Sequence, residues 1–295
     1  MTPGGAILAA VSRPRRWLAQ PGVRAVLPAA LVLAGFVVVA LAAPWLAPLD
    51  PARQSLLARL RRPGAAIGGV TYWLGTDELG RDLLSRIIYG ARASLTVALL
   101  SVAASGTAGT ALGVLAGYFR GWTEIAIMRA VDIMLSIPAI LLAIITVAVL
   151  GPGFLNLIIV LGFTRWPRYT RVAYAQTLSV STQPFITASR LAGARPPRIL
   201  LRHVLPNILA PLIVVATLEF GLMVLFEAGL SFLGLGIQPP TPSWGSIMSV
   251  GRNYVGTAWW IATFPGLCLF LLVLSVNLVG DHLRDLFDPR SNIRA

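Results

Sequence analysis

The residues of this chain that are most able to do chemistry are ionisable side chains that interrupt long apolar runs. Asp132, Glu219 and Glu227 each fall inside such a run, and Arg165 and Arg168 fall in the second half of another. A charge inside a membrane is costly, so these residues normally pair with one another or line a water-filled path. We expect the two arginines to face a water-filled vestibule or partner helices, because both are too deep to face lipid.

The sequence leaves the roles of the three acids open. Asp132 has Arg129 one helical turn before it, so an ion pair between them is favoured over a position that lines a pore. Glu219 has no partner nearby in the sequence and is the better candidate for a cavity. Glu227 is expected to cap backbone or to face the loop that follows it. All three acids and both arginines are therefore candidates for a pore or cavity.

Bond-making chemistry is not expected of this chain. It has two histidines, His203 and His282, and one cysteine, Cys268, which form no nucleophile–base pair or metal-ligand set. All 24 basic residues are arginine, which excludes a Schiff base and a phosphate-binding loop with its lysine. If the protein uses ATP, another chain must bind it. We expect neither an enzyme nor a resident metal.

The composition indicates a polytopic membrane protein. Of 295 residues, 56% are hydrophobic and 12% are charged, and the mean hydropathy is +0.77. Soluble chains average about 25% charged residues, so this chain lacks the polar surface of a soluble domain. The net charge of +13 is attributed to membrane topology and contact with anionic lipid. Binding to nucleic acid is not expected.

Apolar runs predict six membrane-spanning helices in an all-α fold. A span needs about 20 apolar residues. The predicted spans are 25–47, 93–119, 125–150, an arginine-bearing run from 154, a run after Pro206, and 253–280. The core domain is 93–295, and the connecting segments are an N-terminal segment 1–24, an external loop 48–92, a broken external segment 231–252 and a tail 281–295.

Arginine asymmetry predicts the orientation of the spans. If residues 1–24 lie in the cytoplasm, most arginines also lie there, including those of 165–203 and of the tail. Loops rich in arginine stay on the cytoplasmic side. The loop 48–92 fits this rule badly, because seven arginines fall in it and four acids offset them only in part. We expect both termini to be cytoplasmic.

The stretch 181–207 is too polar to span a membrane but has a helical pattern. Pro184 can begin a short helix with one apolar face, and Gly193 can end it at a positive φ. The pair Pro196-Pro197 can begin a second helix. Two short helices hinged at a glycine on the cytoplasmic face suit docking into a groove of another protein. A loop that touches only lipid is the alternative.

This stretch resembles the cytoplasmic EAA loop of ABC importer permeases. The family pattern E-A-A-x-x-x-G, followed by a basic residue and H-x-L-P-N, corresponds to T-A-S-R-L-A-G (187–193) and R-H-V-L-P-N (202–207). Thr187 and Ser189 stand where glutamate and alanine are usual. The resemblance implies that the loop couples to an ATPase subunit through Phe185, Thr187, Ala188, Arg190, Leu191, Gly193, Ala194 and Arg198.

Other segments narrow the resemblance to one kind of permease. The segments L-G-T-D-E-L-G-R-D-L-L-S-R-I-I-Y-G-A-R (74–92), E-A-G-L-S-F-L-G-L-G-I-Q-P-P-T-P-S-W-G (227–245) and G-D-H-L-R-D-L-F-D-P-R (280–290) are similar to the second permease subunit of dipeptide, oligopeptide and nickel importers. Together with W-P-R-Y-T-R (166–171) and V-D-I-M-L-S-I-P (131–138), the resemblance covers about 70–295. It implies the six-span type I importer fold with a cytoplasmic coupling helix.

The resemblance also implies a function and partners. The chain would form half of the translocation pore of an ATP-driven importer for dipeptides or oligopeptides in a bacterial inner membrane. Its partners would be a homologous second permease chain, two cytoplasmic ABC ATPases that bind ATP and Mg, and an external substrate-binding lipoprotein. This chain would hold no cofactor. Import of nickel or haem is the alternative, and a secondary transporter independent of ATP is the rival class.

The external segments are expected to lie at the membrane surface. Thr76 or Asp77 can cap an interfacial helix over 76–92, which would anchor the loop in lipid or contact the binding protein. Glycines and prolines break the chain after the fifth span, and Trp244 is expected to anchor this segment at the interface. The candidates for contact with the binding protein are Asp77, Arg81, Pro239, Pro240 and Trp244.

Overall fold

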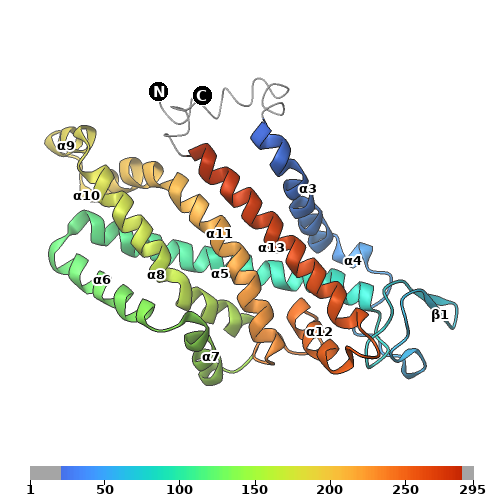
Figure 1. Ribbon diagram of the computed structural model, residues 1–295. Coiled ribbons are helices and arrows are strands. Elements are labelled where there is room, and N and C mark those ends of the chain that lie inside the picture. Colours follow the sequence, from blue (N-terminus) through green and yellow to red (C-terminus); the bar gives the residue numbers. More distant parts are fainter. Residues whose placement is uncertain (1–20, 288–295) are drawn as a thin grey trace.

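The computed structural model describes residues 21–287, with side chains from residue 26 onward. The described part is helical apart from a small hairpin and loops (Figure 1). Its elements are α3 Pro21–Leu41, α4 Ala43–Leu46, the 3-10 turn η1 Leu56–Ala58, β1 Ala65–Ile67, β2 Val70–Tyr72, α5 Leu83–Phe119, α6 Gly121–Ser136, α7 Ala139–Leu150, α8 Phe154–Ser181, α9 Pro184–Leu191, α10 Pro196–Ile199, the π-turn η2 Leu200–Val204, α11 Leu205–Phe232, α12 Trp244–Gly251, the 3-10 turn η3 Arg252–Tyr254 and α13 Trp260–Phe287.

Three helical stretches of the described chain are long and apolar enough to cross a membrane. They are 83–119, 196–232 and 260–287, and the bent pair α6 and α7 makes a fourth if it counts as one span. The apolar part of α3 is shorter, and α8 carries three arginines, Arg165, Arg168 and Arg171, near its middle. The helices establish a multi-pass membrane protein by length and composition, and the arrangement into six spans stays a prediction.

The four long helices α5, α8, α11 and α13 pack into one bundle, with α3 along α13 (Figure 1). The closest contact is between α5 and α8, where glycines let the two backbones approach. A Cβ at Gly109 would lie 2.4 Å from the Trp166 carbonyl oxygen, and one at Gly113 would lie 2.5 Å from the Thr170 oxygen. Small residues permit such close packing between helices in membranes. This contact fixes α8 against α5.

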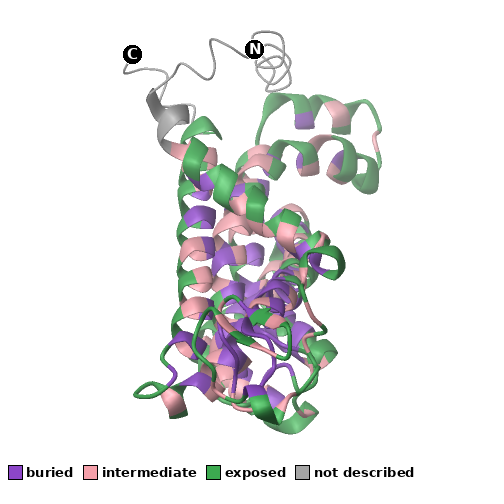
Figure 2. Cartoon of the chain, turned by 90° about the vertical axis from the view of Figure 1, so that its right-hand side faces the viewer, coloured by how far each residue is buried: buried purple, intermediate pink, exposed green. Residues whose placement is uncertain are grey.

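The buried side chains gather toward the end of the bundle opposite α9 and α10 (Figure 2). The largest core cluster joins α5, α7, α8, α11 and α13, and Trp244 of α12 is part of it. A second cluster near α9 contains Ile186, Ile199 and Ile208. Many large apolar side chains elsewhere are exposed in the isolated chain. Exposed apolar surface of this extent is expected where lipid or other chains cover a membrane protein.

The predicted interfacial helix over 76–92 is wrong. The helix begins at Leu83 and runs without a break to Phe119, because Asp82 is the N-cap. The Asp82 carboxylate accepts hydrogen bonds from the Ser85 amide at 2.8 Å and from the Ser85 hydroxyl at 2.7 Å. Capping by an aspartate fixes the start of a helix in this way. Residues 76–82 form a turn, and the predicted second span begins ahead of its expected start.

Two other predicted spans differ from the structure, one by an internal bend and the other by a later start of its helix. The run 125–150 is divided at Pro138 into α6 and α7, which meet at 92°. Proline lacks an amide proton and disfavours helix in the residue before it, so the bend follows from the sequence. The run from 253 begins its helix only at Trp260, since Arg252–Tyr254 is a separate 3-10 turn.

Candidate functional site

The coupling element, residues 184–199, projects at one end of the molecule (Figure 1). Its helices α9 and α10 begin at Pro184 and Pro196, as predicted. Between them Gly193 has a φ of +77°, which confirms the predicted glycine turn. The Ala194 amide donates to the Ser189 carbonyl at 3.1 Å and ends α9. A left-handed glycine is the ordinary way to terminate a helix.

The coupling element is anchored by two isoleucines that the sequence pattern did not single out and by one predicted residue, Arg190. Ile186 and Ile199 are fully buried and pack with the start of α11. The Arg190 guanidinium lies 5.0 Å from the centre of the Tyr118 ring at the end of α5. Ile186 was not predicted, because it lies on the side of α9 opposite the predicted apolar stripe.

The predicted stripe of α9 is left uncovered by the rest of the described chain. Phe185 and Leu191 are exposed, the latter by 86%. The other exposed residues of the predicted set are Thr187, Ala188, Arg190, Gly193 and Arg198, and Ala194 is half-buried. One face of the element is thus fixed to the bundle and the other presents apolar surface outward. This arrangement suits a contact with another protein.

A charge cluster lies between α8, α11 and α6. The buried Glu219 carboxylate of α11 is 3.1 Å from Arg168 Nη1 and 3.7 Å from Arg165 Nη1, both on α8. The Arg165 guanidinium also lies 4.0 Å from the centre of the Phe226 ring. The structure therefore brings three predicted cavity residues together and supplies the partners that Glu219 lacks in the sequence.

The predicted pair of Asp132 with Arg129 is wrong. Asp132 of α6 instead accepts a hydrogen bond at 2.7 Å from Arg171 of α8, and both side chains are 53% exposed. About one turn further along α8, the Tyr174 hydroxyl donates to Glu124 of α6. Two polar links thus fasten α6 to α8. Arg171 is 39 residues from Asp132, so local spacing gave no sign of this partner.

Glu227 does not line a cavity in this structure, which corrects its place among the pore candidates. Its carboxylate is fully buried and accepts hydrogen bonds from the Ser94 hydroxyl at 2.6 Å and the Ser231 hydroxyl at 2.7 Å. The Ser231 oxygen in turn accepts from the Ile237 amide at 3.2 Å. Glu227 therefore ties α5 and α11 to the external segment, in agreement with the expectation that it faces the following loop.

Trp244 is not an interfacial anchor or an external contact. Its side chain is fully buried, and its indole nitrogen donates to the Ile87 carbonyl at 3.0 Å. The ring packs edge-on against Phe36 at 5.5 Å. It fills the space where α3, α5 and α12 meet, because Gly90 leaves room for it on α5.

Asp77 and Arg81 are also buried, so the structure contradicts their assignment as contacts for a binding protein. The Arg81 Nε donates to the Asp77 carboxylate at 2.6 Å, and Arg86 Nε lies 3.4 Å from the same carboxylate. These buried charged side chains stabilise the loop that precedes α5. Pro239 and Pro240 are exposed and stay candidates for that contact.

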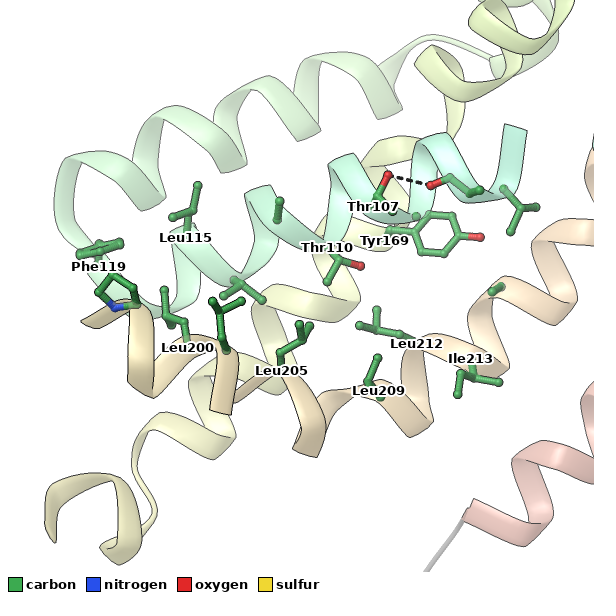
Figure 3. A pocket seen from close by; sticks show the side chains of 18 residues that line it. Thr107, Thr110, Leu115, Phe119, Tyr169, Leu200, Leu205, Leu209, Leu212 and Ile213 are labelled. Atoms are coloured by element: carbon green, nitrogen blue, oxygen red, sulfur yellow. Dashed lines mark hydrogen bonds between the residues drawn. The ribbon is translucent and has the colours of Figure 1, made fainter. Parts of the chain in front are cut away.

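An apolar groove of about 810 Å³ lies between α5 and α11 (Figure 3). It runs from Phe119 and Leu200 near the coupling element to Ile213, with Tyr169 of α8 at its floor. Its polar groups are few, and the Thr107 hydroxyl donates to the Ala103 carbonyl within α5 at 2.7 Å. The groove was not predicted, because its wall is made of residues from helices that are far apart in the sequence.

A multi-span bundle, a projecting short-helix element and charges held in mid-bundle define a membrane transport subunit. Residues 109–293 match the family described as "Binding-protein-dependent transport system inner membrane component". The matched residues include the charge cluster, the coupling element and the external segment. The chain belongs to this family.

Named relatives narrow the similarity within the family. The "Di/tripeptide transport system permease protein DppC" of Pseudomonas aeruginosa is 49% identical over 252 residues, 85% of this chain and 83% of that protein. The "Dipeptide transport system permease protein DppC" of Escherichia coli K12 is 47% identical over 253 residues, 85% of this chain and 84% of that protein.

A solved transporter supports the fold. A chain of the MetNI methionine ABC transporter, in an inward-facing conformation, aligns with a TM-score of 0.57 and 24% identity. The alignment covers 70% of this chain and 98% of that one. The shared fold is that of a type I importer permease, as the sequence resemblance implied.

Proposed function

We propose that this chain is one of two permease subunits that form the translocation pathway of an ATP-driven importer of dipeptides and short oligopeptides. The observation that carries the proposal is the coupling element, which is fixed to α11 by Ile186 and Ile199 and presents Phe185 and Leu191 outward. The peptide cargo is supported by the names of relatives that are 49% and 47% identical over most of the chain.

The proposed complex holds a second, homologous permease chain, two cytoplasmic ABC ATPases and an external substrate-binding lipoprotein. The ATPases bind ATP and Mg, and this chain holds no cofactor. Residues 1–24 and the C-terminal tail lie in the cytoplasm of a bacterial cell, on the same side as the coupling element. The large apolar exposure of the isolated chain agrees with cover by lipid and a second permease.

Transport follows from the rigid attachment of the coupling element. When the ATPases close on ATP, they move α9, and the buried isoleucines pass this motion to α11. Helices α5 and α8 then move as one body, because separating two closely packed backbones would lose the contacts between them. The pathway then opens outward, takes peptide from the binding protein and releases it inward after hydrolysis.

The test is uptake by the reconstituted complex. We test proteoliposomes that hold both permeases and both ATPases. We expect them to take up a labelled dipeptide only when ATP is inside the vesicles and loaded binding protein is outside. Nickel and haem offered with their own binding proteins serve as the cargo controls. Dipeptide flux from the purified chain alone, without ATPases, would contradict the proposal and favour a secondary transporter.

A further inference from the structure

The charge cluster holds more positive charge than its pairs neutralise. Arg165, Arg168 and Arg171 follow one another at intervals of three on α8. Among the residues that the structure describes, the acids that pair with them are Glu219 and Asp132. Three guanidinium groups against two carboxylates leave one positive charge without a counter-ion in this part of the chain.

The surplus charge falls on Arg168. The side chain of Arg165 is 8% exposed and is held between Glu219 and the Phe226 ring. Arg168 engages the same carboxylate through Nη1 alone, and 58% of its side chain is exposed. A guanidinium has five N–H donors in a fixed fork. Most of the donor capacity of Arg168 is therefore free to bind a ligand.

This guanidinium lies halfway along a helix that is predicted to span the membrane. Arg168 follows Phe154, the first residue of α8, by about 21 Å at 1.5 Å per residue, halfway along the helix. Glu219 is likewise near the middle of α11. A charge at this depth that faces lipid costs about 2.5–3.5 kcal/mol. The exposed side of Arg168 must face water or protein instead.

The same side of α8 is polar or small over several turns. Arg171, Ala175 and Ser179 follow Arg168 at helical spacing and are exposed as well. A face that lipid covers would carry large apolar residues here, as Phe163 does on the exposed surface nearer the external end. The stripe has the composition of a wall beside a water-filled path.

We propose that Arg168 forms a carboxylate-binding subsite in the translocation pathway and takes the C-terminal carboxylate of the passing peptide. The inference rests on the proposed function, because only a peptide cargo supplies this carboxylate. Guanidinium groups bind carboxylates through two parallel hydrogen bonds. Glu219 holds the guanidinium in place and lowers the local positive charge. The subsite is therefore weak enough to release its cargo, as a conducting path requires.

The test compares charge variants in the complete reconstituted importer. We expect R168Q to lower the initial rate of dipeptide uptake about tenfold, from the loss of a charge-assisted hydrogen-bonded contact. R168K keeps the charge but not the paired hydrogen bonds, so its rate should fall between those of R168Q and the parent. R129Q, at an exposed arginine on α6, should match the parent. ATP hydrolysis stimulated by loaded binding protein should persist in R168Q, so more ATP is consumed for each peptide moved.

A second measurement reports contact directly. A dipeptide that ends in photoactivatable benzoylphenylalanine should cross-link during turnover to α8 residues beside Arg168, and R168Q should lose most of this product. Parental uptake by R168Q, or cross-links confined to other helices, would overturn the subsite. Loss of the second permease from purified R168Q complexes would also overturn it, because Arg168 would then bind that chain. Failure of the parent complex to transport any dipeptide would instead overturn the proposed function.

Discussion

Single residues in this protein act through the neighbours that tertiary packing gives them. Glu219 is an isolated acid in the sequence but a shared counter-ion for Arg165 and Arg168 in the structure. Glu227, eight residues later, is equally buried but bonds to two serines and holds the external segment. Two glutamates on one helix thus have different partners, and the difference lies in what α5 and α8 present to them.

Trp244 is the residue whose removal should cost the most stability. Trp244→Ala would leave a cavity between α3, α5 and α12 and the Ile87 carbonyl without its donor. Truncation of a buried tryptophan costs about 3–5 kcal/mol. We expect a clear fall in the thermal unfolding midpoint of the detergent-purified complex. Trp122→Ala, at a side chain that is 85% exposed, is the matched control and should change the midpoint little.

At the scale of elements, the sequence predicts what depends on local pattern. The starts of α9 and α10 at prolines and the left-handed glycine between them follow from neighbouring residues, and the structure confirms them. The predicted start of α5 was wrong, because Thr76, Asp77 and Asp82 can all cap a helix and the sequence does not show which of them does. The choice of Asp82 depends on Asp77 being engaged by Arg81 and Arg86.

The partners of charges and the buried aromatic ring were harder to predict. Asp132 has an arginine one turn away, yet it pairs with Arg171, which is 39 residues distant. Local spacing cannot weigh such a contact, since it depends on the bend at Pro138 that sets α6 beside α8. Tryptophan is a residue type common at membrane interfaces, so the sequence placed Trp244 there. Its burial depends on Gly90 of α5, which leaves room for the ring only in the folded structure.

The packing of α5 on α8 should depend on the glycines of α5. Gly113→Val would place a Cβ 2.5 Å from the Thr170 oxygen and 2.6 Å from the Ala173 Cβ, so the helices must separate. Overpacking of this kind typically costs about 1–3 kcal/mol or more. We expect a lower unfolding midpoint and slower transport. Gly35→Ala on α3, where nothing lies within 4 Å, should leave both unchanged.

At the scale of the whole molecule, function requires two ends that face opposite sides of the membrane. The coupling element and the external loop lie at opposite ends of the bundle (Figure 1). The charge cluster lies between them, on α8, α11 and α6. Arginine counts alone place the loop 48–92 ambiguously, so the orientation needs its own test.

We predict that the hairpin β1–β2 faces the outside of the cell membrane. With Cys268 replaced by alanine, Ala66→Cys on the exposed side of β1 should react with an impermeant maleimide in intact spheroplasts. Ala188→Cys on the coupling element should react only after lysis. The opposite pattern of labelling would reverse the topology and place the coupling element away from any cytoplasmic ATPase.

The central claim is that the coupling element transmits the work of the ATPases, and its exposed face tests this most directly. Ala188→Trp adds bulk to that face, and Gly193→Val forces a β-branched residue to a φ of +77°. Neither change touches the bundle, because nothing lies within 4 Å of a Cβ at Gly193 and Ala188 is exposed. Thr187→Glu, which restores the usual family residue at an exposed position, is the control.

The decisive measurement is dipeptide uptake, together with the amount of ATPase retained, in purified complexes of these variants. We predict that Ala188→Trp and Gly193→Val pair normally with the second permease. They should lose ATPase subunits, or lose the stimulation of hydrolysis by loaded binding protein, and uptake should fall about tenfold or more, as expected when a close-packed contact is disrupted. Thr187→Glu should transport at the parental rate. Parental uptake by both disruptive variants with ATPases bound would contradict the account.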